Sequence, residues 1–123
     1  NKIEAVLNRW QDNKLRTLAL AKLFDVETLF VWQPVPFFEY PGELLIFELF
    51  GDAVGGHLRS TYTYPAMKAL YQNGKLDDKV AWCADIQKNI TKNMYVDHVH
   101  YNPEMSSRVA DCIVEHDILT RLD

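Results

Sequence analysis

The sequence predicts one α/β domain over residues 1–123, in which helices cover a parallel sheet. Residues 1–24 carry a long amphipathic helical pattern, and the apolar run "TLFVWQ", Thr28 to Gln33, follows almost at once. A second apolar run, "KVAWCA", occupies Lys79 to Ala84. A strand that is apolar at nearly every position is typical of a parallel sheet buried on both faces. A helix that leads into such a strand is half of a β-α-β unit, and 123 residues are enough for one hydrophobic core.

The first helix is predicted from an apolar stripe that resumes after the break "QDN". This helix is predicted to end at Asp25 and Val26. Pro34 and Pro36 end the strand that follows, because proline cannot continue the hydrogen-bond ladder. The stripe consists of Ile3, Val6, Leu7, Trp10, Leu15, Leu18, Ala19 and Leu23.

The middle of the chain is predicted to hold two helices joined by a glycine-rich loop. The segment "ELLIFELF", residues 43–50, is predicted as a helix whose role is a lid, an oligomer contact or part of the core, with the core as the default. The loop "GDAVGG", residues 51–56, lacks the spacing of a phosphate-binding loop. Residues 59–73 are predicted to be helical at least from Pro65 onward, and Asn73–Gly74 is a typical helix stop.

The last helix is predicted to begin near Asn102. Asparagine is a strong N-cap, and a proline such as Pro103 suits the first helical position. Between the second strand and this helix, residues 85–93 are predicted to form a loop or a short helical turn. The buried stripe of the last helix consists of Met105, Val109, Cys112 and Ile113.

Only two strands are visible in the sequence, and a two-stranded sheet is not stable on its own. The chain also opens with "NKIEAVLNRW", which is typical of the middle of a helix. We therefore expect the domain to be incomplete at its N-terminus, with further strands upstream of Asn1 or supplied by a partner chain.

Composition excludes some classes of partner. The net charge is −4 and no cluster of Lys and Arg occurs, so the sequence predicts no nucleic-acid partner. No apolar run approaches about 18 residues, so it predicts no membrane span. The two cysteines, Cys83 and Cys112, lie in apolar contexts, which favours buried free thiols, with a disulfide between them as the alternative. The sequence does not predict a compartment.

The stretch "VDHVHYNP" carries the candidate catalytic residues, with Asp97, His98 and His100 just before the last helix. A histidine that acts as a base needs a held ring, and a carboxylate bonded to one ring nitrogen both holds the ring and stabilises the imidazolium. Asp97 and His100 can satisfy this requirement if the loop curls back. Two alternatives remain open: a metal site that uses His98 and His100, and an ordinary capping loop.

A second candidate site follows the first strand, in "FVWQPVPFF". Ligands of open parallel sheets bind beyond the carboxyl ends of the strands. Gln33, Pro34, Val35 and Phe37 would then line a substrate cleft. The alternative is a buried strand followed by a proline-stiffened loop.

Three segments, "LFVWQPVPFF", "VAWCAD" and "YVDHVHYNPEMSSRVADCIVEHDI", resemble in this order the C-terminal part of the SGNH/GDSL serine hydrolase superfamily. The resemblance implies that the chain is part of a doubly wound, flavodoxin-like parallel sheet flanked by helices. It implies Asp97 as the triad acid and His100 as the triad base, acting on a small-molecule ester without a cofactor. Asp85 matches the position after an earlier strand, and no role is implied for His98.

The chain departs from this family because the nucleophile and oxyanion-hole blocks do not occur before Asp97. No serine follows Gly51–Asp52, and Ser60, Ser106 and Ser107 stand in other contexts. A catalytic histidine needs its serine within about 3 Å, and each oxyanion donor is worth roughly 2.7–4 kcal/mol. We therefore expect little activity from this chain alone, and we expect the nucleophile to come from a missing N-terminal half.

The alternative to an esterase is a non-catalytic α/β binding or assembly module that retains the Asp-x-x-His remnant. A partner chain or an oligomer is compatible with either interpretation. The presence of a nucleophile block upstream of Asn1 would favour the enzyme over the module.

Overall fold

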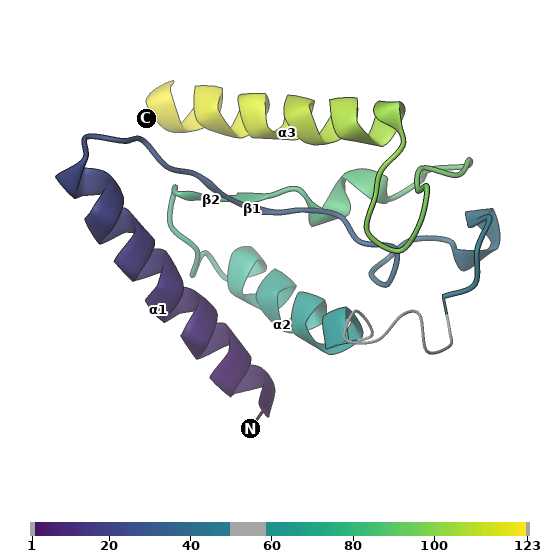
Figure 1. Cartoon of the computed structure of the whole chain (residues 1–123), viewed down its shortest axis with the longest axis horizontal. Helices are drawn as coiled ribbons and strands as arrows, with labels where there is room; N and C mark the ends of the chain where they lie inside the picture. The colour runs from purple at the N-terminus through teal and green to yellow at the C-terminus, as the bar shows by residue number, and fades with distance from the viewer. Residues whose placement is uncertain (1, 50–58, 123) are drawn as a thin grey trace.

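The computed structural model describes residues 2–49 and 59–122 (Figure 1). Helices dominate this part of the chain, and the strands are short. In chain order, the helices, strands and 3-10 turns are α1 (Lys2–Leu23), β1 (Phe30–Trp32), η1 (Gly42–Leu44), α2 (Ser60–Gln72), β2 (Val80–Trp82), η3 (Ala84–Gln87) and α3 (Pro103–Leu122).

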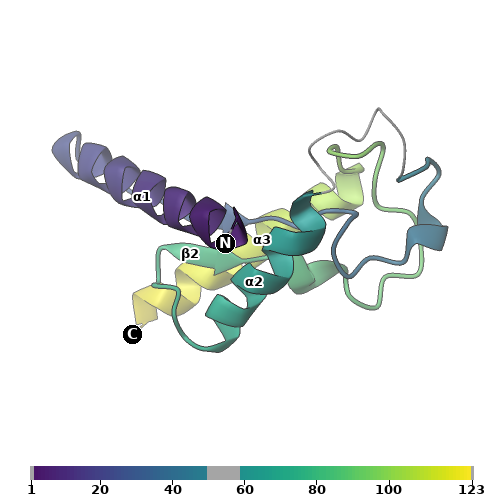
Figure 2. The ribbon, with the colours of Figure 1, turned by 90° about the horizontal axis from the view of Figure 1, so that it is seen from below.

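The two strands form a parallel pair at the centre of the molecule. Phe30 lies opposite Val80, and Trp32 lies opposite Trp82. Helix α2 lies between the strands in the sequence, so the segment from β1 to β2 is a β-α-β unit. Helix α3 covers one face of the pair, while α1 and α2 cover the other (Figures 1 and 2). This cover on both faces explains why the strands are apolar throughout.

The predicted fold class is wrong in its main feature. The described residues contain a two-stranded parallel sheet and three helices, and they show no doubly wound, flavodoxin-like sheet. The sequence pattern was sufficient for one β-α-β unit, because that unit needs only two apolar strands and an amphipathic crossover. Such a unit is shared by several α/β folds, so it does not by itself specify a doubly wound sheet.

Most predicted element positions are confirmed. Both terminal helices and both strands occur where the apolar pattern placed them, and α2 begins at Ser60, ahead of Pro65. The predicted stop of α2 is also confirmed, because Gly74 has a φ of 64° and its N–H donates to the Tyr71 carbonyl at 3.0 Å. A left-handed residue at this position is what glycine provides at helix ends.

The helix predicted over residues 43–50 is wrong for its described part. Only the η1 turn is helical, and the chain continues in bends to Leu49. Burial alternates from Leu45 to Leu49, with Ile46 and Glu48 exposed, which is the period of an extended chain and not of a helix. Leu44, Leu45 and Phe47 pack against a core cluster instead. The predicted core role is therefore confirmed for these side chains, although the predicted conformation is not.

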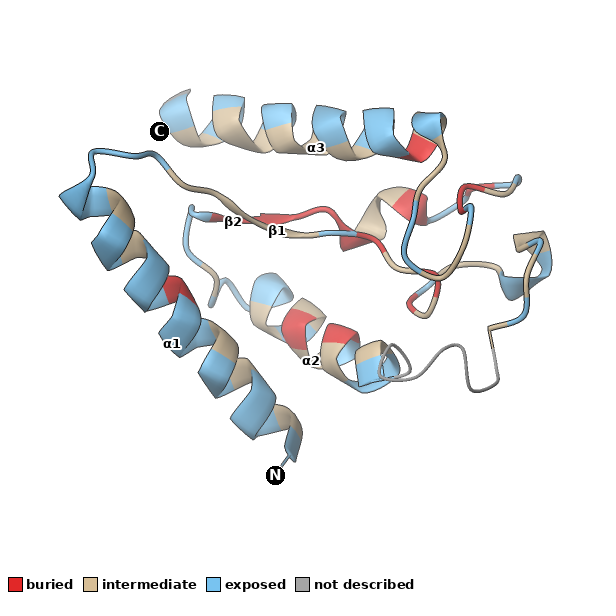
Figure 3. Cartoon of the chain, in the orientation of Figure 1, coloured by how far each residue is buried: buried red, intermediate tan, exposed pale blue. Residues whose placement is uncertain are grey.

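The hydrophobic core consists of two clusters on either side of the loop that follows β1. The first cluster surrounds the strand pair and consists of Phe38, Tyr64, Met67, Val80, Trp82 and Ala84. The second lies under the 43–49 segment and consists of Ile90, Met94, Tyr95 and Met105. Figure 3 shows that the outer faces of the helices are exposed. Among the helices of the described residues, none is long and apolar enough to cross a membrane.

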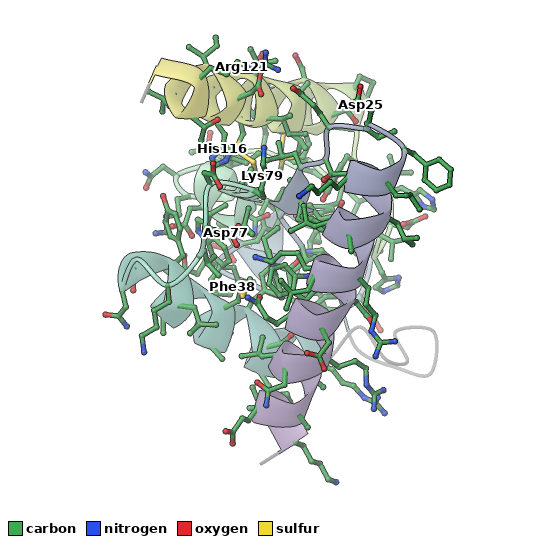
Figure 4. The ribbon with its side chains drawn as sticks, turned by 90° about the vertical axis from the view of Figure 1, so that its left-hand side faces the viewer. Asp25, Phe38, Asp77, Lys79, His116 and Arg121 are labelled. Atoms are coloured by element: carbon green, nitrogen blue, oxygen red, sulfur yellow. A yellow bond between two sulfur atoms is a disulfide. The ribbon has the colours of Figure 1, made fainter. Side chains whose placement is uncertain are left out.

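One charged side chain is buried in the helix layer. Lys14 of α1 is 2% exposed and forms an ion pair with Asp77 in the connection between α2 and β2. Its ammonium group also lies 5.8 Å from the centre of the Trp10 ring. Figure 4 shows Asp77 beside α1, on the side of this helix that faces α2. The pair therefore attaches α1 to the β-α-β unit.

The cysteines form a disulfide, so the favoured prediction of two free thiols is wrong. Cys83 follows β2, and Cys112 lies on α3, which packs against that strand (Figure 1). Their Cα atoms are 6.0 Å apart, within the range that a disulfide spans. Apolar sequence context cannot separate a buried thiol from a buried disulfide, because both exclude water.

We expect the replacement of both cysteines by serine to lower the free energy of unfolding by about 3–4 kcal/mol, as loop-closure entropy gives for a crosslink of this length. The bond closes a loop with a sequence separation of 29. Urea unfolding with and without a reductant measures the effect. The reductant should destabilise the native chain and leave the double variant unchanged. Two titratable thiols in the unreduced protein would contradict the crosslink.

Candidate active site

The candidate site lies beyond the carboxyl ends of the two parallel strands. β1 leads into residues 33–40, and β2 leads into η3. The loop that carries Asp97 and His100 precedes α3 at the same end of the molecule (Figure 1). The two segments singled out by the sequence are therefore brought together by the fold.

The loop that carries the acid–base candidates is closed at its base. Tyr95 and Tyr101 form an antiparallel bridge, and the Val96 N–H donates to the His100 carbonyl at 2.9 Å. The Asn102 N–H donates to the Met94 carbonyl at 3.0 Å, one step further out. Residues 95–101 thus form a compact loop with its ends side by side.

Asn102 fixes this loop to the start of α3, as the sequence predicted. Its Oδ1 accepts from the Met105 N–H at 2.9 Å, the bond expected of an N-cap, and Pro103 is the first helical residue. Its Nδ2 donates to the Asn93 carbonyl at 3.0 Å, on the chain that enters the loop. One side chain therefore joins both ends of the loop to the helix.

Asp97 and His100 form a hydrogen-bonded pair. His100 Nδ1 lies 2.7 Å from Asp97 Oδ2 and 2.9 Å from Oδ1. A carboxylate only accepts hydrogen bonds, so Nδ1 carries the proton and Nε2 of the neutral ring carries the lone pair. This tautomer is the one that a general base requires. The side chains are 72% exposed for His100 and 46% exposed for Asp97.

The Asp97 carboxylate is stabilised by several donors. Its Oδ1 also accepts from the Val99 N–H at 2.9 Å and from the His100 N–H at 2.8 Å. The Val99 amide, followed by the His100 side chain and amide, lowers the pKa of Asp97 to about 2. Asp97 therefore remains ionised at neutral pH and can orient the His100 ring.

His98 points away from this pair. Its Nε2 lies 2.7 Å from the Glu48 carbonyl and therefore donates to it. Its ring stacks on Phe37, with an interplanar angle of 11°, and meets the edge of Phe47. A protonated nitrogen cannot ligate a metal in that state. Among the residues that the structure describes, no group of three or more His, Cys, Asp or Glu side chains could hold a metal ion.

The predicted substrate wall lines a small cavity of about 100 Å³. Val99, the neighbour of His100, lies in the same lining. Pro34 is buried, Val35 and Phe37 are half-buried, and Gln33 is exposed. The full lining consists of Gln33, Pro34, Val35, Pro36, Phe37, Ser60, Tyr95, His98, Val99 and Tyr101.

Gln87 holds the two halves of the site together, and sequence reasoning missed it. Its Nε2 donates to the Val35 carbonyl at 2.9 Å and to the Phe38 carbonyl, and its Oε1 accepts from the Tyr95 hydroxyl at 2.5 Å. Burial raises the pKa of Tyr95, so this hydroxyl remains a donor. Nothing in the local pattern marked Gln87, because polar residues are common in a segment predicted as a loop.

A ring of four charges supports the same loop from the outside. Lys68 of α2 pairs with Glu39 at 2.5 Å and with Asp85 at 3.6 Å, and Lys88 pairs with the same two carboxylates at 3.3 and 3.2 Å. Lys68 is 14% exposed, so this corner of the ring is largely shielded from solvent. Asp85, which matched the hydrolase pattern, is thus part of an ion-pair network.

The serines of this chain do not complete a triad. Ser106 Oγ donates to the Asn102 carbonyl at 3.1 Å, and Ser60 lines the cavity. In the described ranges 2–49 and 59–122, which contain all three serines, no hydrogen bond joins a serine hydroxyl to His100.

Comparisons with protein-family models, curated proteins and solved structures gave no match to the chain.

We expect Gln87→Leu to lower the free energy of unfolding by about 3 kcal/mol, because buried groups that lose their hydrogen-bond partners cost roughly 1–3 kcal/mol each. The variant leaves the Phe38 carbonyl and the Tyr95 hydroxyl without their partner, while the Val35 carbonyl still accepts from the Phe38 N–H at 3.2 Å. Urea unfolding measures the change. Gln72→Leu is the matched control, because Gln72 is exposed at the end of α2. Equal effects of the two substitutions would contradict the role given to Gln87.

We expect acid to weaken the fold through Asp97. Its pKa is lowered to about 2 in the folded chain, so its stabilising contribution is complete above the unfolded value of about 3.9 and is lost as the pH falls toward 2. Asp97→Asn keeps an acceptor for the Val99 and His100 amides but should lose this pH dependence. Carboxyl carbon NMR of Asp97 and unfolding between pH 2 and 5 measure the effect. Titration of Asp97 at its ordinary value would contradict the geometry.

Proposed function

We propose that this chain supplies the acid–base pair of an SGNH/GDSL-like hydrolase that acts on esters. His100 acts as general base and then as general acid, and Asp97 orients it. The observation that carries the proposal is the 2.7 Å contact between His100 Nδ1 and Asp97 Oδ2. The residues between them in the sequence, His98 and Val99, line the same cavity as Gln33, Pro34, Val35 and Phe37. The nucleophilic serine comes from polypeptide outside these 123 residues.

The proton chemistry follows from the tautomer. Nε2 of the neutral His100 ring takes the proton of the serine hydroxyl as the serine attacks the ester carbonyl. The charge that develops on the imidazolium is stabilised by Asp97, which stays ionised because its pKa lies at about 2. The same Nε2–H then protonates the leaving alcohol. Besides the residues of this chain, the step requires a serine hydroxyl within hydrogen-bond reach of Nε2 and donors for the oxyanion that forms on the ester carbonyl.

The size of the cavity favours a substrate whose acyl group is small and binds inside it. Its volume of about 100 Å³ leaves little room beyond a few heavy atoms. Proline and aromatic side chains form much of its wall, and such surfaces hold apolar groups without hydrogen-bonding them. The exposed Gln33 at the rim can bond a polar part of the substrate.

A non-catalytic binding or assembly module is the second candidate. The observation that favours it is the local role of Asp97, whose Oδ1 accepts from two backbone amides of its own loop. Such a bond pattern stabilises turns that have no catalytic role. The high exposure of His100, 72%, also suits a surface loop.

The decisive experiment uses the protein expressed from the complete gene. A fluorophosphonate probe should label a serine, and aryl acetate hydrolysis should be measurable. His100→Ala should lower kcat by a factor on the order of 10⁴ or more, because removal of one triad member abolishes most of the contribution of the triad. Asp97→Asn should also lower kcat strongly, because it no longer fixes the tautomer.

His116→Ala is the matched control for this experiment. His116 lies on α3, and its Nε2 lies 2.7 Å from the Asp78 carbonyl, at the other end of the molecule from the 95–101 loop. Figure 4 shows it on the side of α3 that faces the segment with Asp77 and Lys79. We expect kcat to be unchanged in this variant. Absence of probe labelling, or activity that survives His100→Ala, would contradict the hydrolase and favour the module.

A further inference from the structure

We propose that His98 is a positioning residue, which fastens the loop carrying Asp97 and His100 to the 43–49 segment and to the cavity wall. Only the expected effect of His98 on catalysis rests on the proposed function. The fastening itself is a property of the fold. Sequence reasoning gave His98 no role beyond the metal alternative, so this assignment comes from the contacts alone.

The ring of His98 is held from two sides by different segments. Phe37, on the loop after β1, stacks against it with ring centres 6.4 Å apart and an interplanar angle of 11°. Phe47, in the 43–49 segment, meets it at 4.9 Å and 60°. Both distances lie within the range in which aromatic rings attract one another. The imidazole of His98 therefore joins its own loop to two segments that lie about fifty or more residues earlier in the chain.

The hydrogen bond to Glu48 sets the direction of the ring. Nε2 lies 2.7 Å from the Glu48 carbonyl, and a carbonyl accepts only, so the donor must be the imidazole. Glu48 follows Phe47 directly, which means that the bond and the edge contact act on the same short piece of chain. This pair of contacts restrains both the position and the rotation of the His98 side chain.

The base of the loop is tied to its surroundings by the hydroxyls of Tyr95 and Tyr101, which donate to Gln87 Oε1 at 2.5 Å and to the Pro34 carbonyl at 2.6 Å. The bonds of its tip, residues 96–100, are different. Asp97 bonds Val99 and His100, and Val96 bonds His100, so all of these bonds join members of the same loop. For residues 96–100, among the described residues, the hydrogen bonds and ring contacts that reach outside the loop are those of His98. The tip of the loop, which carries the acid–base pair, is therefore restrained against the cavity wall by this side chain, in addition to the bonds of Tyr95 and Tyr101 at its base.

The 43–49 segment gains its own restraint from the same contacts. Its apolar side chains pack on the second core cluster, but η1 is its only regular turn in the described chain. Backbone that lacks regular hydrogen bonds opens more easily than helix or sheet. His98 thus restrains two irregular segments against each other, and loss of its side chain should loosen both.

The test is amide hydrogen exchange by NMR on the complete chain, which requires no activity. His98→Ala should accelerate exchange about tenfold or more at both the 43–49 and the 95–101 segments, as expected for the loss of local restraint. His98→Gln, whose amide can still donate to the Glu48 carbonyl, should recover part of the protection. His98→Phe keeps the ring contacts without the donor and separates the two contributions, and it replaces His98→Ala if that variant does not fold.

His116→Ala is again the matched control, because His116 also bonds a backbone carbonyl through Nε2 at 2.7 Å. It should leave exchange at both segments unchanged. Acceleration confined to the 95–101 loop, or equal in both variants, would overturn the proposal. In the complete gene product, His98→Ala should lower kcat more than it changes KM, with recovery by His98→Gln. Exchange that responds as expected in a protein without esterase activity would retain the fastening role and reject the hydrolase.

Discussion

The side-chain amide of Gln87 is the interaction on which the candidate site depends. It is fully buried and bonds two carbonyls of the loop after β1 and the hydroxyl of Tyr95. Tyr95 is also one end of the bridge that closes the 95–101 loop. Gln87 therefore links the cavity wall to the acid–base loop through hydrogen bonds. Because its bonds to the Phe38 carbonyl and the Tyr95 hydroxyl are buried, the loss of Gln87 would leave both of these groups unsatisfied at once.

Two other restraints act on the same region from different sides. The disulfide joins the end of β2 to α3 and thus fixes the helix that follows the acid–base loop. The ion-pair ring of Glu39, Lys68, Asp85 and Lys88 joins the loop after β1 to α2 and η3. A parallel pair of three-residue strands contributes few ladder hydrogen bonds. The side-chain and covalent links therefore have a large share in holding the helices around the small sheet.

Features that depend on local sequence were predicted well, and features that depend on distant contacts were not. The N-cap at Asn102 and the stop at Gly74 follow from the chemistry of single residues, and both were predicted. The conformation of residues 43–49 was not, because its apolar side chains fit a helix as well as an extended segment that packs on a core. The disulfide was the less favoured alternative, and the role of Gln87 was missed, for the same reason. Cys83 and Cys112 are 29 residues apart, and the carbonyls that Gln87 bonds lie 49 and 52 residues before it. For the candidate site, the sequence predicted that Asp97 and His100 form a pair, which the structure contains, but it did not predict the side chains that position this pair.

The geometry of the Asp97–His100 pair alone does not distinguish an enzyme from a capped turn. An aspartate that accepts from the amides two and three residues later forms the same loop in either case, and a histidine at the third position will meet its carboxylate. Catalysis requires in addition that the loop be held in place relative to a substrate site. Gln87 and His98 provide this restraint, because each connects the loop to the cavity wall without using the Asp97–His100 pair. These contacts therefore meet a requirement of the proposed enzyme, and a binding module that presents the same loop to a partner has the same requirement.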